Sequence, residues 1–269
     1  MAELSITMAV VGTLGLVIYS LLNIGTILGA KNTAVNTAHQ QARVAMLKMI
    51  EDLHSAVSVP ALVNPVGTVT PVAPEISFQQ WGSAPVNGQL TPNGGPHKIR
   101  NDAATGQNQI RIVVTGTQPI PVVNQRVIIP THQIEEDIIA VNGGANDCIL
   151  TLRNNLTTAI KGTNSTAGDI ICYITDRCSY KVVLVNAGPP AEYKLQFVNT
   201  QGARDIVNDI TNPTPFSIPL TPAGALYNRF VAAIDLSTSD PKYTKRGYKS
   251  ANILLNGQVP FKTRLTIFQ

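Results

Sequence analysis

The first sixty residues constrain the fold of this chain more than any other stretch. Leu4 to Ala30 contains no charged side chain, and at about 1.5 Å per residue it would form a helix of about 40 Å, enough to cross the apolar core of a bilayer. The segment from Lys31 to Val59 contains neither Gly nor Pro. Because Pro60 is the first residue that must stop a helix, the sequence predicts one continuous helix over residues 1–59.

The two halves of the predicted helix differ in character. Residues 4–30 are apolar on all sides, which is typical of a segment that lies in a membrane or in the core of an assembly. In the second half, small and apolar residues recur three or four positions apart, which predicts one buried stripe. We expect this stripe to hold a folded domain; it consists of Val35, Ala38, Ala42, Ala45, Met46, Met49, Leu53 and Ala56.

Glycines interrupt the apolar half. Each costs up to about 1 kcal/mol of helix propensity in water, and Gly25 and Gly29 form a small-xxx-small pair. In lipid such a pair allows two helix backbones to approach closely, which predicts packing against other helices. The alternative is that glycine is simply more frequent in membrane spans.

The rest of the chain has the composition of a β-rich, loop-rich domain. Only 13% of the 269 residues are charged, and there are 18 Pro and 20 Gly. Residues 60–96 read as a Pro-rich linker with one strand, Glu75 to Trp81, and residues 97–269 as a globular outer domain. Further strands are expected at 109–115, 126–129, 136–141, 148–153, 169–175, 180–185, 193–199, 215–220, 230–236, 251–255 and 262–268. The predicted fold class is α+β, a long helix followed by a mainly antiparallel β domain.

The sequence contains no pattern typical of an enzyme or of a metal site. It lacks HExxH, P-loop and GxSxG motifs, and His39 and His54 would lie about 22 Å apart on the helix. Glu135, Glu136 and Asp137 are the densest carboxylate cluster, but neighbours on a strand alternate faces, so a solvated strand end is favoured over calcium binding. No cofactor is expected. A net charge of +4 with 5% aromatic residues gives no case for a nucleic-acid partner.

Three cysteines are available for disulfide formation. Cys172 and Cys178 flank five residues, and if Asp176 lay near the tip of a hairpin the two thiols would face each other at a distance that a disulfide can bridge. The competing pairing joins Cys148 to either of them. A bridge between Cys172 and Cys178 would be a local clip that closes a short loop.

Two surface features indicate contacts or modification. Asn155 and Asn164 each begin a triplet that fits the N-glycosylation pattern. The stretch from Ser237 to Ser250 places basic residues between tyrosines, which could contact a phosphate backbone or an acidic surface. An exposed hairpin tip that contacts a neighbouring subunit is the favoured interpretation of this stretch; its basic residues are Lys242, Lys245, Arg246 and Lys249.

The N-terminal helix resembles that of type IV pilins and pseudopilins. Ala2-Glu3-Leu4 followed by a long apolar run is similar to the start of mature pilins, with Glu3 at the position of the family's glutamate. The segment from Ala42 to Ala56 is similar to that of larger minor pilins and of J-type pseudopilins of type II secretion. Met1 departs from the family pattern at the start, and Glu51 and His54 stand where arginine is usual.

This resemblance implies a structural subunit of an extracellular filament. The subunit would be held in the inner membrane, then assembled by dedicated machinery with copies of itself or other pilin subunits into a filament on the cell surface. Glu3 would pair with a neighbour's terminal ammonium, since a carboxylate in an apolar setting is costly alone, and Arg43 and Asp52 match the family segment. Size and this segment favour a minor or priming component. The alternative function is a membrane-anchored binding module that does not polymerise.

Overall fold

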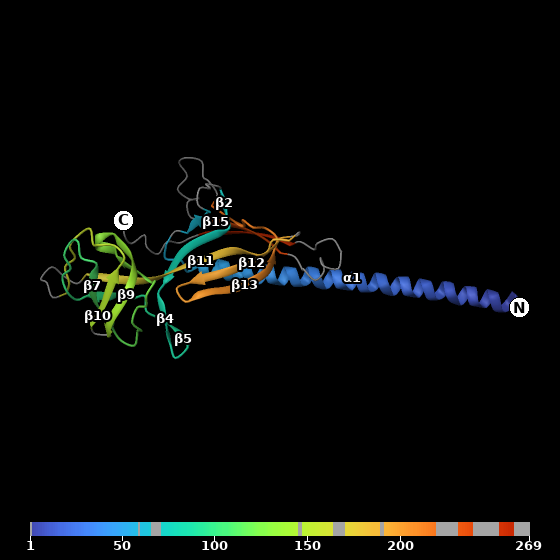
Figure 1. The fold of residues 1–269 in the computed structure, drawn as a ribbon, viewed down its shortest axis with the longest axis horizontal. Helices are drawn as coiled ribbons and strands as arrows, with labels where there is room; N and C mark the ends of the chain where they lie inside the picture. The colour runs from blue at the N-terminus through green and yellow to red at the C-terminus, as the bar shows by residue number, and fades with distance from the viewer. Residues whose placement is uncertain are drawn as a thin grey trace.

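The computed structural model pairs one long helix with antiparallel β sheets (Figure 1). It describes residues 2–58, 60–65, 71–144, 147–163, 170–188, 191–218, 231–238 and 253–260, without the side chains of 2–5, 231–232, 237–238 and 253–260. The predicted α+β fold class is confirmed. Helix α1 spans Ala2–His54, and a 3-10 turn, η1, spans Pro130–His132. The strands are β1 (Ala61–Val63), β2 (Val72–Ala73), β3 (Glu75–Trp81), β4 (Ser83–Val86), β5 (Gln89–Pro92), β6 (His97–Ile99), β7 (Gln109–Val113), β8 (Arg126–Ile129), β9 (Ile134–Gly144), β10 (Asp147–Leu152), β11 (Ile171–Asn186), β12 (Glu192–Asn199), β13 (Gly202–Ile210), β14 (Phe216–Ser217), β15 (Val231–Thr238) and β16 (Ile253–Pro260).

Helix α1 ends five residues before the predicted boundary. The chain leaves the helix after His54 because the next residues form hydrogen bonds with strand β3. The Val57 amide donates to the Gln79 carbonyl at 2.7 Å, and the Gln79 amide donates to Ser58 Oγ at 3.0 Å. These bonds provide partners for backbone groups that would otherwise continue the helix.

Strand β11 is the axis of the β domain. Its sixteen residues would extend over about 50 Å. Its carboxyl half pairs with β12 and β3, and its amino half with β6 and β8. All of these pairings are antiparallel.

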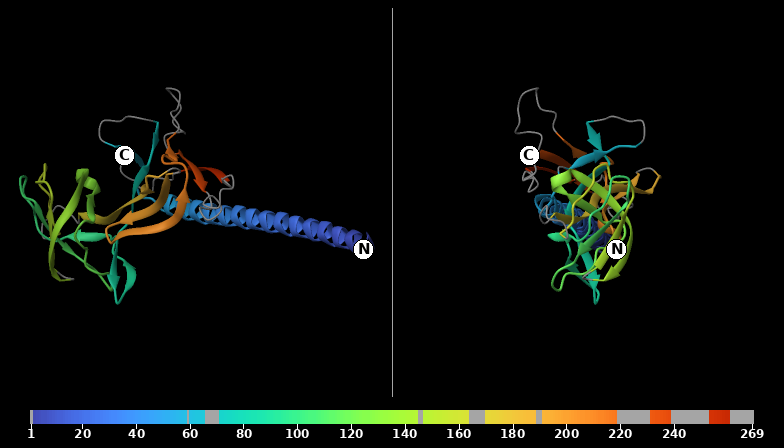
Figure 2. Two further views of the ribbon diagram at one scale, coloured as in Figure 1. Left: turned by 45° about the vertical axis from the view of Figure 1, so that its right-hand side comes forward. Right: turned by 90° about the vertical axis from the view of Figure 1, so that its left-hand side faces the viewer.

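Two separate cores lie along β11 and define two lobes. In the proximal lobe the carboxyl half of β11 packs with β3, β12, β13, β14, β15 and the helix. In the distal lobe its amino half packs with β6 to β10. Figures 1 and 2 show the distal lobe beyond the carboxyl end of the helix, at the opposite end of the molecule from the N-terminus.

The predicted helix stripe forms one wall of the proximal core. Its members are buried apart from Val35, which is half-buried, while the neighbouring Ala34 is buried. Met49 and Leu53 contact the core that contains Ile76, Tyr180 and Phe216. Small residues at 34, 38, 42 and 45 let the helix lie close to the sheet.

Several strand predictions are wrong in informative ways. The two strands expected at 169–175 and 180–185 are one strand, β11. The region expected to be a linker with one strand, residues 60–96, contributes β1 to β5, of which only β3 was predicted. Strand β13 had no counterpart in the prediction because its sequence, GARDIVNDI, has little apolar alternation. The strand predicted at 262–268 lies outside the described residues.

Candidate functional site

The apolar half of α1 projects from the folded domain (Figure 1), and most of its described side chains are exposed. Apart from the half-buried Ile27, the large apolar residues described in this half are each at least 50% exposed: Ile6, Met8, Val10, Val11, Leu14, Leu16, Val17, Ile18, Tyr19, Leu21, Leu22, Ile24 and Leu28. Among the described residues this is the one helix long and apolar enough to cross a membrane. A contiguous apolar surface of this size indicates a site that is covered by lipid or protein.

The glycine pair lies on the side of the helix that faces away from the β domain. Within the described part of the chain, and apart from the neighbouring backbone of α1 itself, Gly25 and Gly29 have no atoms within 4 Å of the position that a Cβ would occupy. Each is about 160° around the helix axis from Ile27, which is half-buried on the side of the buried Ala34. A second helix could therefore approach the Gly25–Gly29 face without meeting the domain.

The Asp52 carboxylate forms contacts within its own chain. The hydroxyl of Tyr180 on β11 donates to Asp52 Oδ2, and Lys48 Nζ lies 3.0 Å from Asp52 Oδ1. Burial, and then the Asp52 carboxylate, raise the pKa of Tyr180, so the phenol stays a donor. Asp52 therefore fixes the helix to the sheet. Arg43, the other predicted assembly residue in the segment from Ala42 to Ala56, is exposed on the helix.

The other predicted contact residues are only partly described. The backbone of Glu3 lies in α1, but its side chain is outside the described residues, as are Asn164 and the basic residues Lys242, Lys245, Arg246 and Lys249. Asn155 is exposed in a loop after β10. The backbone of the following Leu156 holds this loop through hydrogen bonds with Gln107 and Gly106.

The predicted disulfide between Cys172 and Cys178 is wrong. Both residues lie on β11, six positions apart on one extended strand rather than across a hairpin, which separates them by about 20 Å. Cys148, Cys172 and Cys178 are all free and buried, so the competing pairings are absent as well. Burial raises the pKa of Cys148 to about 11 and those of Cys172 and Cys178 to about 12.

Asp176, expected near a hairpin tip, is instead the centre of a buried network between the lobes. Its carboxylate accepts hydrogen bonds from the Ser83 amide at 3.0 Å, from Gln125 Nε2 at 2.9 Å and from Thr200 Oγ1 at 3.0 Å. Gln125 also exchanges hydrogen bonds with the side chain of buried Asn93. The sequence signal for this network is the polar pair Thr175-Asp176 inside an apolar run.

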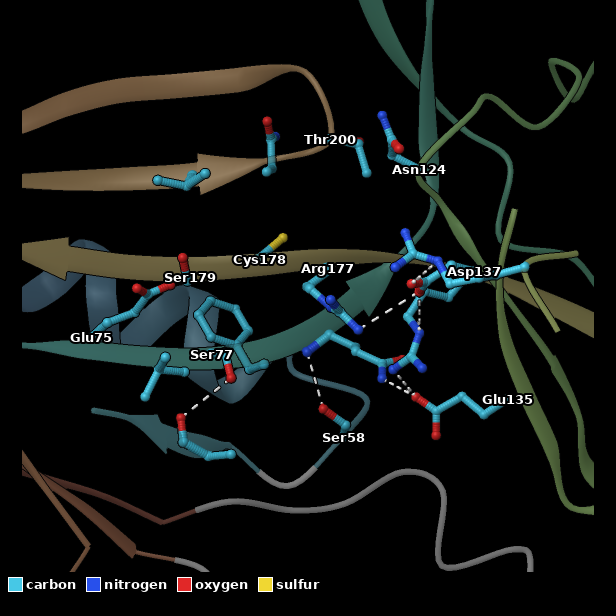
Figure 3. Close-up of a pocket in the computed structure, with 18 residues that line it drawn as sticks. Ser58, Glu75, Ser77, Asn124, Glu135, Asp137, Arg177, Cys178, Ser179 and Thr200 are labelled. Atoms are coloured by element: carbon cyan, nitrogen blue, oxygen red, sulfur yellow. Dashed lines mark hydrogen bonds and ion pairs between the residues drawn. The ribbon is translucent and has the colours of Figure 1, made fainter. Parts of the chain in front are cut away.

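A cavity of about 790 Å³ lies where the two lobes meet (Figure 3). Its wall in the distal lobe carries Arg126, Glu135, Asp137 and Arg153, and Arg177 projects from β11. Asp137 Oδ1 is 2.8 Å from Arg126 Nε and 3.6 Å from an Arg177 Nη, and Asp137 Oδ2 is 3.4 Å from Arg153 Nε. Sequence reasoning did not find this cavity because its arginines come from three separate segments.

The carboxylates around this cavity are engaged by nitrogen donors. Glu135 accepts from Arg126 and from the side-chain Nε2 of Gln79. The neighbouring Glu136, which does not line the cavity, accepts from Asn154 Nδ2 at 3.0 Å. No group of three or more His, Cys, Asp or Glu residues in the described part of the chain is placed to hold a metal ion. The arrangement is suited to hydrogen bonding and to charge recognition.

Comparison with known proteins does not assign a family. No family model, curated protein or solved structure matches the chain. The architecture itself, one long apolar N-terminal helix followed by an antiparallel β domain, is pilin-like.

Proposed function

We propose that this chain is a structural subunit of a type IV pilus-like or pseudopilus filament. The observation that carries the proposal is the division of α1, whose carboxyl half is buried in the proximal core while its apolar half projects uncovered. Such a helix would reside in the membrane before assembly and then pack with helices of other subunits. The β domains would form the outer surface of the filament.

Helix packing has to supply much of the energy of assembly. Lipid already satisfies the apolar side chains, so moving them from the membrane into a bundle gains little from the hydrophobic effect. Close approach at the Gly25–Gly29 face, pairing of Glu3 and contacts between outer domains would provide the gain. Family resemblance and the size of the chain favour a minor, tip or priming position.

Replacing Glu3 tests the proposal. In the native cell we expect Glu3→Ala to abolish filaments that contain the chain, because the carboxylate would lose its pairing with a neighbouring amino terminus. The matched control is Glu51→Ala, on the exposed face of the same helix, which should leave filaments intact. Surface filaments are collected by shearing and imaged by electron microscopy, and the membrane content of each variant is measured by immunoblot.

Two results would contradict the proposal. One is a Glu3→Ala strain with the same number and composition of filaments as the parent strain. The other is the absence of this chain from every filament of the parent strain, detected with an antibody to the β domain. A repeating density that fits the chain would identify a main subunit, and labelling only at filament ends would identify a tip component.

A membrane-anchored binding module is the second candidate function. The cavity between the lobes favours it, since a binding site on a tethered domain needs no polymer. In that case Glu3→Ala would retain both membrane content and ligand binding.

A further inference from the structure

Two of the three arginines at the cavity are weakly held. Arg153 and Arg177 have side chains 62% and 57% exposed, and their contacts with Asp137 are 3.4 and 3.6 Å long. Arg126, by contrast, is 19% exposed and contacts the same carboxylate at 2.8 Å. Exposed ion pairs of this length contribute little to stability. Arg153 and Arg177 can therefore reorient toward a bound group at small cost.

The wall of the cavity has more positive charge than its own carboxylates neutralise. Arg126, Arg153 and Arg177 face Glu135 and Asp137, which leaves one net positive charge among these five residues. Glu75 lies farther along the floor (Figure 3) and is paired with Lys181 at 3.8 Å. Each guanidinium has five N–H donors in a fork that matches a carboxylate. The three arginines therefore have more N–H donors than their contacts with Glu135 and Asp137 use.

The floor of the cavity is a row of small side chains across four strands. Ala61 of β1, Ser77 of β3, Ser179 of β11 and Val198 of β12 are neighbours in register, and all four line the cavity. Three strand spacings make this row about 14 Å long, the length of about four residues of an extended peptide. The Ser77 hydroxyl donates to the Ala61 carbonyl at 3.3 Å and can accept from a peptide N–H, while the Ser179 hydroxyl, which is 7% exposed, can donate or accept.

We propose that this cavity binds an acidic peptide segment of a partner protein, with its carboxylates on Arg153 and Arg177. The segment lies along the serine floor and places its acidic side chains against the wall of the distal lobe. Single-stranded nucleic acid is disfavoured because Phe78, the one aromatic residue among the described residues that line the cavity, is only 2% exposed and provides no stacking surface. The site functions whether or not the chain polymerises.

The test uses the full chain in a non-ionic detergent and a fluorescein-labelled hexaglutamate peptide. Fluorescence anisotropy at low salt should show binding of the peptide. The binding should weaken at 300 mM NaCl, because about 0.3 M salt screens interactions between exposed charges that are more than a few Å apart. The double variant R153Q/R177Q should bind about tenfold more weakly or worse. Its melting temperature should match that of the parent chain, because these arginines contribute little to the fold.

A second double variant controls for general loss of charge. R100Q/K161Q also removes two positive charges, from residues of the distal lobe that do not line the cavity, and should keep the parent affinity. Equal weakening in both double variants, or no hexaglutamate binding by the parent chain, would overturn the proposal. Binding of a galacturonate trimer in place of hexaglutamate would also overturn it and would identify an acidic saccharide as the ligand.

Discussion

His97 is a buried titratable residue on β6, in the distal lobe. Its ring is 0% exposed, and its Nε2 lies 2.7 Å from the Asn93 carbonyl oxygen. Burial lowers the pKa of His97 from its ordinary value of 6.5, and the hydrogen bond to the backbone of Asn93 offsets part of this effect. The folded chain therefore binds fewer protons than the unfolded chain just below pH 6.5.

This difference predicts an acid-dependent loss of stability. The contribution of His97 is fully present above pH 6.5 and is lost as the pH falls below it, at up to about 1.4 kcal/mol per pH unit. His97→Gln keeps an Nε2 donor for the Asn93 carbonyl but does not titrate, so its free energy of unfolding should fall less steeply between pH 6.5 and 5. Urea unfolding of both chains across this range measures the difference. Parallel pH profiles would contradict the role of His97.

At the residue scale, the sequence predicted which residues are buried better than it predicted which residues contact each other. The periodicity of α1 identified its buried stripe because helical spacing depends only on nearby residues. It could not show that Asp52 meets Tyr180, 128 residues later. The arginines around Asp137 were unpredictable for the same reason, since their convergence depends on strand pairing rather than on any local pattern.

At the scale of elements, the packed half of α1 allows a comparison within one helix. Leu53 is 1% exposed in the proximal core, whereas Leu47 is 57% exposed on the opposite side of the helix. Leu53→Ala should lower the free energy of unfolding by about 2–5 kcal/mol, because it removes buried apolar contacts and leaves a cavity.

Leu47→Ala is the matched control for that substitution. It makes the same chemical change in the same helix and should alter stability by less than about 0.5 kcal/mol. The free energy of unfolding of both variants is measured by denaturant titration of the full chain in detergent, with near-ultraviolet circular dichroism as the signal. Equal destabilisation by the two substitutions would mean that the carboxyl half of α1 is not packed on the sheet.

Strand β11 shows why element boundaries were harder to predict than element types. The polar residues of ITDRCSY resemble a turn between two apolar runs, yet Asp176 accepts hydrogen bonds from groups of both lobes. A polar residue inside a strand is stable where tertiary partners satisfy it, and the sequence alone does not reveal such partners. The same effect concealed β13, while Glu75–Trp81 and Arg126–Ile129 were predicted at their observed bounds.

At the scale of the whole molecule, the two lobes behave as one body only if their junction is rigid. Strand β11 passes through both cores, and at its midpoint Asp176 joins Gln125 near the distal lobe to Thr200 at the turn between β12 and β13. The junction also sets the width of the arginine-lined cavity, which has residues of both lobes on its walls. The geometry of the site therefore depends on a network that lies behind it.

Removing the Asp176 carboxylate should loosen this junction. Asp176→Ala leaves the Ser83 amide and Thr200 Oγ1 without their buried acceptor and removes one of the three acceptors of Gln125 Nε2, which should cost about 2–4 kcal/mol of stability. Hydrogen exchange should quicken in segments of both lobes beside the network. Asp205→Ala, which removes an exposed carboxylate of β13 that accepts hydrogen bonds from Lys194 and Gln196 of β12, should leave stability and exchange nearly unchanged. Faster exchange in only one lobe of the Asp176→Ala chain would mean that the lobes are coupled through β11 alone.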